Sequence, residues 1–541
     1  MSLPKPNSAW PPPELAKVIE RTTESHVWWE GSTVGLNDYY SADSNTQQTS
    51  TRKRIKDAYN AFWGRTTTPT TQPIKRLHAP IPGVITKLST TELFNQPLRI
   101  LAAEGENTGV QEAADLIFNT PTFHSALVAA GEACSALGGN YQRVVWDPTI
   151  ADNAWIDFVD ADCAIPEFRW GRLVAVTFWS ELEGSDDRVV WRHFERHEPE
   201  RIVHALYVGT PTNIGRMEAL EAHDDTRGIK LDGFSDEIGG FITTGVKELT
   251  AQYVPNVTPN PEWRTSPTLR HLGRADISSD VIPIFHEIDR VYSSLMRDFR
   301  VAQARMYASE NVLTTMGRGK GMSFSEDQEI FTAVGSAMGK DGSMESLFQF
   351  HQPDIRVLAH SEGGDLLLRE VLRKTGYSPV SLGMSDEVAQ TATEATGKKQ
   401  LTVATTQGKA RHWGGALGPL TTTCLRVSAH KFAGVAPTED LVIEWPEFAR
   451  DSDEAKSRTV QGWATAMAAS TRTKVAYLHK DWDDDQIDEE VKLIDKAAEV
   501  AVPDFGGGFG GDNPPLPGDD APADDAKPVE DKPAEGNPFA K

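Results

Sequence analysis

A long, weakly apolar helix near the C-terminal end is the feature that most constrains this fold. It follows a loop rich in Pro, Gly and Ser, and Ser385 offers a capping oxygen with Asp386 and Glu387 in the first turn. Such residues complement the free amide groups that begin a helix. The segment as far as Gly434 is rich in Ala and Thr, and Pro419 is expected to break it. A polar helix of this length is stable mainly through packing, so we expect neighbours along its whole length, a first indication of a ring-forming assembly.

A second long helix is expected between Ser279 and Glu310, where apolar residues recur at helical spacing over about seven turns, roughly 40 Å. An ordinary core helix would show the same pattern, but the length favours a spanning strut. A compact insertion with a strand at Ile355–Leu358 should follow, and then a shorter helix at Asp365–Lys374. The apolar residues at helical spacing between Ser279 and Glu310 are Ile284, Ile288, Val291, Leu295, Phe299, Ala302 and Met306.

In the N-terminal half, helical segments and a series of short strand patterns predict an α+β fold with a meander-like antiparallel sheet. Trp170, Trp179 and Trp191 are interpreted as core or sheet-face residues rather than as a ligand cage. The loop-rich region 209–276 includes a possible helix at Ile214–Ala222. The other expected helices are His78–Pro97, Ala113–Phe118 and Phe123–Leu137, and the expected strands are Leu98–Ala102, Tyr141–Trp146, Trp155–Val159, Leu173–Glu181, Val189–Glu195 and Arg201–Val208.

The C-terminal region should contain a strand at Leu441–Trp445 and helices at Asp453–Ala469 and Gln486–Val500. From Pro503 onward the chain consists largely of Gly, Pro, Asp and Ala. Such a segment has too few apolar residues to offset the entropy of ordering, so a disordered acidic tail is expected.

The length of 541 residues suggests three or four structural units, and the net charge is −24. An acidic chain does not hold nucleic acid through bulk electrostatics, although DNA could still slide past it. The scattered Cys134, Cys163 and Cys424 support neither a disulfide framework nor a zinc site. Because there is no apolar leader and no long apolar run, we expect no signal peptide, no membrane span and a soluble protein made in the cytoplasm.

No motif for catalysis, cofactor binding or metal binding emerges. The glycine loop 317–321 lacks the residues of a phosphate-binding loop, and the aspartates at 481, 483 and 485 lack the glycine and glutamate of a calcium loop. No histidine pair has zinc-binding spacing, and no nucleophile elbow is present. Lys398 and Lys399, with Lys409 and Arg411 further along, are either a solvated face of the long helix or a contact to DNA.

Several short fragments of the sequence are informative through their order along the chain. The fragments are Trp28-Trp29-Glu30-Gly31, Asp38-Tyr39-Tyr40, Leu77-His78-Ala79-Pro80, Ala136-Leu137-Gly138-Gly139-Asn140-Tyr141, Trp146-Asp147-Pro148, Val159-Asp160-Ala161-Asp162, Pro166-Glu167-Phe168-Arg169-Trp170-Gly171, Asp289–Met306, Gly376-Tyr377-Ser378-Pro379 and Thr391-Ala392-Thr393-Glu394. With these fragments in this order, the chain resembles the portal proteins of tailed bacteriophages, of the siphophage type common in phages of actinobacteria and other Gram-positive hosts. The resemblance extends to about residue 500.

The resemblance implies a homo-oligomeric ring of twelve subunits at one vertex of a virion capsid. Such a ring is a passive conduit for double-stranded DNA during packaging, retention and ejection. Its partners would be the terminase large subunit, a head-completion or adaptor protein, and the major capsid and scaffolding proteins, with no membrane and no cofactor. The alternatives are another oligomeric virion protein, of the capsid or baseplate, or a nucleic-acid-processing enzyme.

The resemblance also implies a division of the chain and a set of contact residues. The parts are an N-terminal arm and wing (1–277), a first stem helix (278–313), a clip (314–359), a second stem helix (360–376), a channel loop (377–387), a long wing helix with a return strand (388–449), a helical crown (450–502) and the tail (503–541). DNA-facing residues would be Tyr377, Ser378, Pro379, Val380, Ser381, Leu382, Gly383, Met384 and Ser385. Arg318 and Lys320 would contact terminase or the adaptor, and Lys398 and Lys399 would line the lumen.

Overall fold

The computed structural model describes residues 3–42, 77–235, 239–302, 355–384, 392–446, 453–479 and 484–500, with short pieces at 305–308, 314–315, 322–323, 348–351, 448 and 482. The chain divides into two units, Met1–Ser452 and Asp453–Lys541, which are described separately. The first unit mixes helices with antiparallel sheets, so the predicted α+β class is confirmed.

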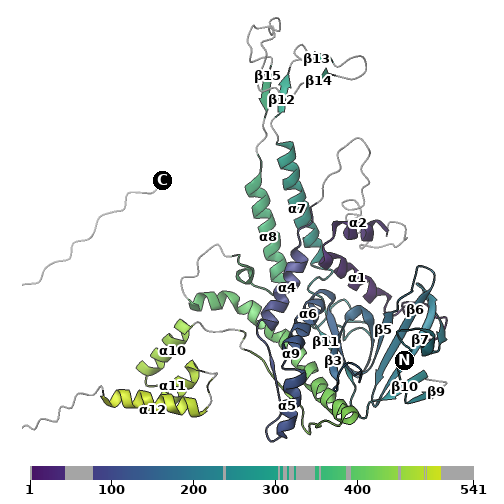
Figure 1. Cartoon of the computed structure of the whole chain (residues 1–541). Coiled ribbons are helices and arrows are strands. Elements are labelled where there is room, and N and C mark those ends of the chain that lie inside the picture. The colour runs from purple at the N-terminus through teal and green to yellow at the C-terminus, as the bar shows by residue number, and fades with distance from the viewer. Residues whose placement is uncertain are drawn as a thin grey trace, which may run out of the picture. The chain divides into compact units, whose positions relative to one another are not determined.

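A seven-stranded antiparallel sheet dominates the N-terminal half (Figure 1), in the order β4-β5-β6-β7-β10-β9 with β8 paired to β7. Residues on alternate positions of β6 and β7, such as Phe194, Val203 and Tyr207, are buried against Trp10 of the N-terminal segment. Its strands are β4 (Ala164–Arg169), β5 (Arg172–Glu181), β6 (Val190–Glu198), β7 (Arg201–Thr210), β8 (Asn213–Glu218), β9 (Gly233–Ser235) and β10 (Gly239–Thr243).

A second sheet packs with helices into the largest hydrophobic core. Its strands are ordered β11-β2-β3, and a separate pair, β1-β16, joins Ile100 to Ile443. In this core the Trp413 ring meets the edge of Phe94 at 5.2 Å between ring centroids. The elements are β1 (Arg99–Leu101), β2 (Gly139–Val145), β3 (Trp155–Asp160), β11 (Ala251–Pro255), β16 (Val442–Glu444), α4 (Ile81–Phe94), α5 (Thr108–Ile117) and α6 (Pro121–Leu137).

The long helix is α9, Ala392–Phe432, and it runs through Pro419 without a break, so the predicted break is wrong. A proline removes one helical hydrogen bond and crowds the carbonyl four residues earlier, here that of Gly415. Burial compensates for this cost, because Leu417 and Leu420 on either side are fully buried in the core. The predicted packing along the helix is confirmed for this C-terminal half.

Two antiparallel helices, α7 (Ile282–Val301) and α8 (Val357–Thr375), form a hairpin that rises from the rest of the first unit (Figure 1). The first helix is shorter than predicted: it ends at Val301, and Met306 lies in strand β12 (Arg305–Ala308), paired with β15 (Phe348–His351). At Met306, the pairing of β12 with β15 decides the structure rather than the helical spacing of the apolar residues. The strand predicted at Ile355–Leu358 is also wrong, because α8 already begins at Val357.

Two further expectations in the sheet region are wrong. Ile214–Ala222 forms β8 and a short 3-10 turn instead of a helix, because the edge of β7 is available for pairing. Trp170 lies in the turn between β4 and β5 and is 96% exposed, so it is neither a core nor a sheet-face residue, whereas Trp179 and Trp191 are half-buried on the sheet as expected.

The remaining helices are α1 (Ala16–Glu30) and α2 (Thr33–Ala42), which pack through Trp28 and Tyr40 near the base of α7. The second unit contains α10 (Asp453–Thr465), α11 (Thr471–Leu478) and α12 (Asp484–Val500), of which α11 was not predicted. Residues 503–541, predicted as a disordered tail, lie outside the described residues. In the described part of the chain, no helix combines the length and hydropathy that a membrane span requires.

Candidate functional site

The α7–α8 hairpin is held at both ends by ion pairs between residues within or next to its two helices. At the far end, Asp298 binds Arg356 at 3.0 Å and His360 at 3.1 Å. At the base, Lys374 lies 3.4 Å from Asp280. Hydrogen bonds from His360 and Arg356 lower the pKa of Asp298, so this carboxylate is ionised at neutral pH. The two helices are thus aligned antiparallel along their length.

A buried carboxylate in α7 fixes the hairpin to the segment that precedes α4. Asp289 accepts hydrogen bonds from the backbone amide of Ala79 and from Nδ1 of His78, both at 2.8 Å. Burial nevertheless raises the pKa of Asp289, and the bond from His78 only partly offsets this. One turn further along, Ser293 accepts from the backbone amide of Leu77 at 3.1 Å. These bonds determine where α7 leaves the core.

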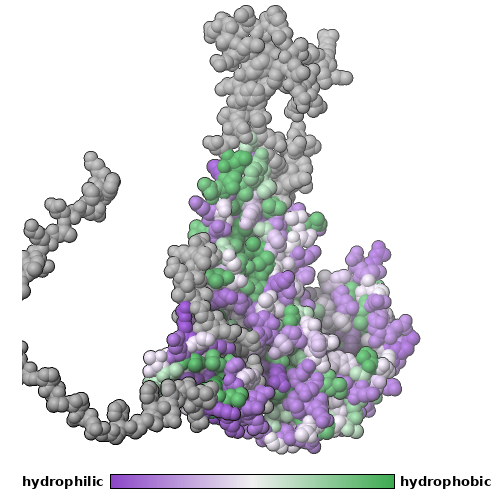
Figure 2. Space-filling view, turned by 60° about the vertical axis from the view of Figure 1, so that its left-hand side comes forward, coloured by the Kyte–Doolittle hydropathy of each residue, from purple (hydrophilic) through white to green (hydrophobic). Residues whose placement is uncertain are grey.

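Large apolar side chains remain exposed on the hairpin. On α7, Tyr292, Met296 and Phe299 follow one another at spacings of four and three residues, which places them on one face. On α8, Leu358 and Leu366 are 77% and 70% exposed. Hydrophobic surface is correspondingly prominent over this part of the molecule in Figure 2. An apolar surface of this kind on a projecting element is typical of a site of contact with another molecule.

The loop after α8 is anchored on α9. Gly376 ends α8 with a φ of 84°, a conformation that favours glycine, and Thr405 donates a hydrogen bond to its carbonyl at 2.7 Å. Thr402 accepts from the backbone amide of Ser378 at 2.9 Å and bonds Oγ of Ser381 at 2.8 Å. The segment Pro379–Leu382 is a 3-10 turn.

The side chains of Tyr377 and Ser378 are buried, which leaves residues 379–384 as the part of the predicted channel loop with accessible surface. Ser385, the last residue of that prediction, lies outside the described residues. The DNA-facing role of this loop stays a prediction.

A buried ion pair connects this loop, the long helix and the start of the hairpin. Nζ of Lys409 in α9 lies 2.6 Å from Asp276 and 2.7 Å from Oγ of Ser89 in α4. The Tyr377 ring lies beside the same ammonium, 5.5 Å from Nζ to the ring centroid. Burial alone would lower the pKa of Lys409, but the attraction of Asp276 outweighs it and raises this pKa. Burial also raises the pKa of Tyr377 to about 12.

Lys409 was interpreted from the sequence as part of a charged face, and the structure corrects this. The sequence contained a signal for the burial of this lysine, because it lies on a helical stripe whose members are all buried. The stripe consists of Thr402, Thr406, Lys409, Trp413 and Leu420. A lysine on such a stripe needs a buried partner, yet nothing in the sequence marks Asp276 as that partner.

The other predicted contact residues are only partly described. Lys399 is exposed on α9, and Lys398 belongs to the same helix. Arg318 and Lys320 lie outside the described residues, so their proposed contact with terminase or an adaptor stays a prediction.

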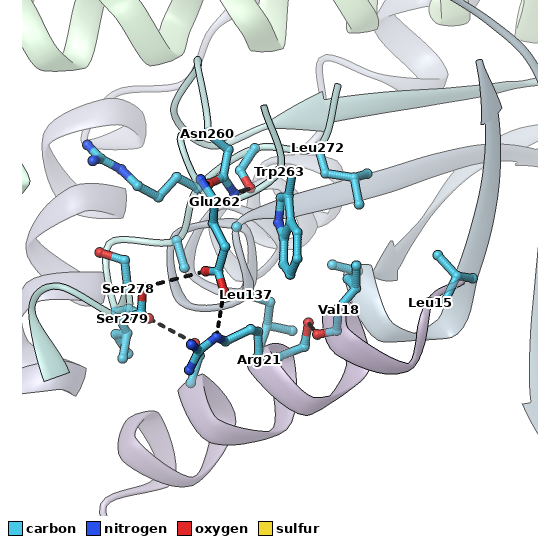
Figure 3. A pocket seen from close by; sticks show the side chains of 18 of the residues that line it. Leu15, Val18, Arg21, Leu137, Asn260, Glu262, Trp263, Leu272, Ser278 and Ser279 are labelled. Carbon is cyan, nitrogen blue, oxygen red and sulfur yellow. Dashed lines mark hydrogen bonds and ion pairs between the residues drawn. The ribbon is translucent and has the colours of Figure 1, made fainter. Parts of the chain in front are cut away.

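A cavity of about 430 Å³ lies where α1, β11 and the segment before α7 meet (Figure 3). Its walls are largely apolar, with Val18, Trp263 and Leu272 among the lining residues. At its rim Arg21 binds Glu262 at 2.9 Å, so this carboxylate is engaged in an ion pair. Within the ranges that the structure describes, no three His, Cys, Asp or Glu side chains are grouped to hold a metal ion.

No protein-family model and no curated protein matches the chain. Among solved structures, it is similar to a chain described as "Neck of empty GTA particle computed with C6 symmetry", with 13% sequence identity and a TM-score of 0.37, covering 74% of this chain and 90% of that one. This similarity establishes neither the fold nor the function of the protein.

Proposed function

We propose that this protein is a bacteriophage portal protein, a subunit of a ring that conducts double-stranded DNA through one capsid vertex. The observation that carries the proposal is the α7–α8 hairpin, which stands out from the core with apolar side chains exposed on both helices. In a closed ring, each subunit contacts its neighbours through two different faces. The exposed side chains of α7 and α8 would then be buried between adjacent hairpins.

The connection of the hairpin to the loop supports the same function. Residues 379–384 follow α8 directly and are held by Thr402 and by the buried Tyr377. A loop anchored in this way at the base of a ring of hairpins would reach the axis of the channel. The net charge of −24 suits a lumen along which DNA slides, because tight phosphate binding requires dense Lys and Arg.

The deciding experiment is electron microscopy of the purified full-length protein, with mass photometry. Rings with an axial hole are expected, of about twelve copies if the resemblance holds. A double substitution Leu358→Asp/Leu366→Asp should abolish the rings, because it introduces charge into the proposed interface. Leu116→Asp is the matched control, since Leu116 is 73% exposed on α5 outside the hairpin. A compact dimer or tetramer without a hole would overturn the proposal.

The partners can be tested separately. Assembled rings should bind duplex DNA weakly and with little salt dependence, and tight binding at low salt would contradict a non-adhesive lumen. Arg318→Ala/Lys320→Ala should impair DNA packaging or tail joining. Normal packaging and joining by this variant would remove these two residues from the contact with terminase or the adaptor.

A further inference from the structure

The turn between β4 and β5 carries an exposed tryptophan in an unfavourable backbone conformation. Trp170 has a φ of 52° and is 96% exposed, and Gly171 follows with a φ of 82°. Two positive φ values in a two-residue hairpin loop favour Asn and Gly, whereas a bulky side chain is strained there. In the part of the chain that the structure describes, no ring or cation contacts Trp170. No such contact within the described residues offsets the strain and the exposure, which points to a contact with another molecule.

The residues around Trp170 are cationic. Arg169 and Arg172 flank it, pair with each other across the hairpin and are exposed. Neither has an ion-pair partner among the described residues. Arg270 is exposed nearby, next to His271, which lies beside Gly171. We call Arg169–Arg172 the basic tip.

The opposite end of β5 is acidic. The turn between β5 and β6, residues 182–189, contains Glu183, Asp186 and Asp187 against a single Arg188. Asp186 accepts hydrogen bonds from the amides of residues 188 and 189 and shapes the turn. Glu183 and Asp187 are exposed and have no ion-pair partner in the described ranges. We call residues 182–189 the acidic turn.

The acidic turn also offers apolar surface to an incoming aromatic ring. Val189 is 44% exposed, and two residues on, Trp191 is half-buried against the ring of His223 at 5.6 Å between centroids. Val189 directly precedes β6 and Trp191 is the second residue of that strand, so both lie beside the carboxylates of the turn. We call these two residues the Val189–Trp191 patch.

We propose that the basic tip of one copy binds the acidic turn of the next copy in the ring, with Trp170 on the Val189–Trp191 patch. The inference rests on the proposed ring and adds a second contact to it, away from the α7–α8 hairpin. The two surfaces lie at opposite ends of the ten-residue strand β5, about 30 Å apart. Each copy can therefore bind one neighbour through its basic tip and the other neighbour through its acidic turn. This is the heterologous contact that closes a ring. The chain's net charge of −24 makes a second copy a better partner for the basic tip than a nucleic acid.

Disulfide trapping tests the contact directly. Trp170→Cys/Asp187→Cys, in full-length protein with Cys163→Ser, should give a ladder of covalent multimers on oxidation, whereas either cysteine alone should give at most dimers. Cys134 and Cys424 are buried and should not contribute. A bond within one copy is excluded, because a disulfide needs Cα atoms within about 7 Å. Leu116→Cys/Asp187→Cys is the control, and a ladder no stronger than this control overturns the inference.

Charge exchange tests the chemistry of the same contact. Arg169→Glu/Arg172→Glu and Glu183→Arg/Asp187→Arg should each lower the affinity between copies on the order of tenfold or more, and combining all four should restore it. If the combined variant assembles no better than either pair, the inference is wrong. If the pairs change binding to a short DNA duplex but not assembly, the partner of the basic tip is nucleic acid and the inference is likewise wrong.

A third variant separates an intermolecular role from a structural one. Trp170→Gly should raise the melting temperature of the single chain, because glycine tolerates the positive φ, while it weakens assembly. A lower melting temperature with unchanged assembly would show that Trp170 serves only its own hairpin. If the variants still form rings, the inference is wrong but the proposed function remains intact. If the double-cysteine variant gives a ladder although the wild-type protein forms no ring, only the proposed function is contradicted.

Discussion

The ammonium group of Lys409 lies 2.6 Å from the carboxylate of Asp276, and both side chains are almost completely buried, at 4% and 2% exposure. One residue belongs to the long helix α9, and the other lies six residues before the start of α7. The pair therefore ties the helix that carries the anchored loop to the helix that begins the hairpin. Ser135 completes the arrangement by donating a hydrogen bond to Asp276 at 2.6 Å.

We expect Lys409→Met to lower the free energy of unfolding by about 3–5 kcal/mol, because the carboxylate of Asp276 would be left buried without its counter-charge. Lys409→Met/Asp276→Asn should recover part of this loss. Urea unfolding followed by circular dichroism measures both. Lys399→Met, an exposed lysine on the same helix, is the control and should change stability by less than about 0.5 kcal/mol. An equal effect of the two lysine substitutions would contradict the role of the pair.

A second prediction concerns the pH dependence of stability. Burial lowers the pKa of His204 to about 4, although Glu195 opposes this, and Nδ1 of His204 lies 3.2 Å from Nε2 of His193. The positive charge of Arg143 also disfavours its protonation. In the unfolded chain the pKa of a histidine is about 6.5, so the unfolded state binds the proton more readily.

The contribution of neutral His204 is therefore complete above about pH 6.5 and is lost as the pH falls towards 4, with a slope of at most about 1.4 kcal/mol per pH unit. His204→Gln should flatten the curve of unfolding free energy against pH in this window. A curve with the same slope in both proteins would show that other groups cause the loss.

Asp289 provides a third prediction. Asp289→Leu should cost about 2–4 kcal/mol, because the amide of Ala79 and the ring of His78 would lose their buried acceptor. Asp289→Asn keeps an oxygen for the amide of Ala79 and should cost less. Thermal unfolding of the two variants compares them. Similar losses for Asn and Leu would show that the negative charge matters rather than the acceptor.

The anchored loop can be tested through its hydrogen bonds to α9. Thr402→Val removes the hydroxyl that binds Ser378 and Ser381, so hydrogen exchange of residues 376–384 should become faster, with a global loss of only about 1–2 kcal/mol. Thr423→Val is the control, because the hydroxyl of Thr423 bonds to the carbonyl of Pro419 within α9. Unchanged exchange in the Thr402 variant would mean that the bond from Thr405 to Gly376 and the burial of Tyr377 are sufficient to hold the loop.

The sequence by itself determined the regular elements whose patterns are local. β5 was predicted at Leu173–Glu181 and is found at Arg172–Glu181, and α6 was predicted at Phe123–Leu137 and begins at Pro121. Alternation in strands and helical spacing of apolar residues reflect one-sided burial, which each segment encodes alone. The order of the helices α7, α8 and α9 was likewise predicted from residue order.

The tertiary structure decided whatever depends on a distant partner. Pro419 remains helical because the core around it repays the lost hydrogen bond, and Met306 is in a strand because Phe350 lies opposite it. Lys409 is buried only because Asp276, far away in the chain, faces it. Trp170 was expected in the core or on a sheet face, yet it lies in the turn between β4 and β5 and is exposed to solvent. These outcomes are set by long-range pairing and burial, which a local pattern in the sequence does not contain.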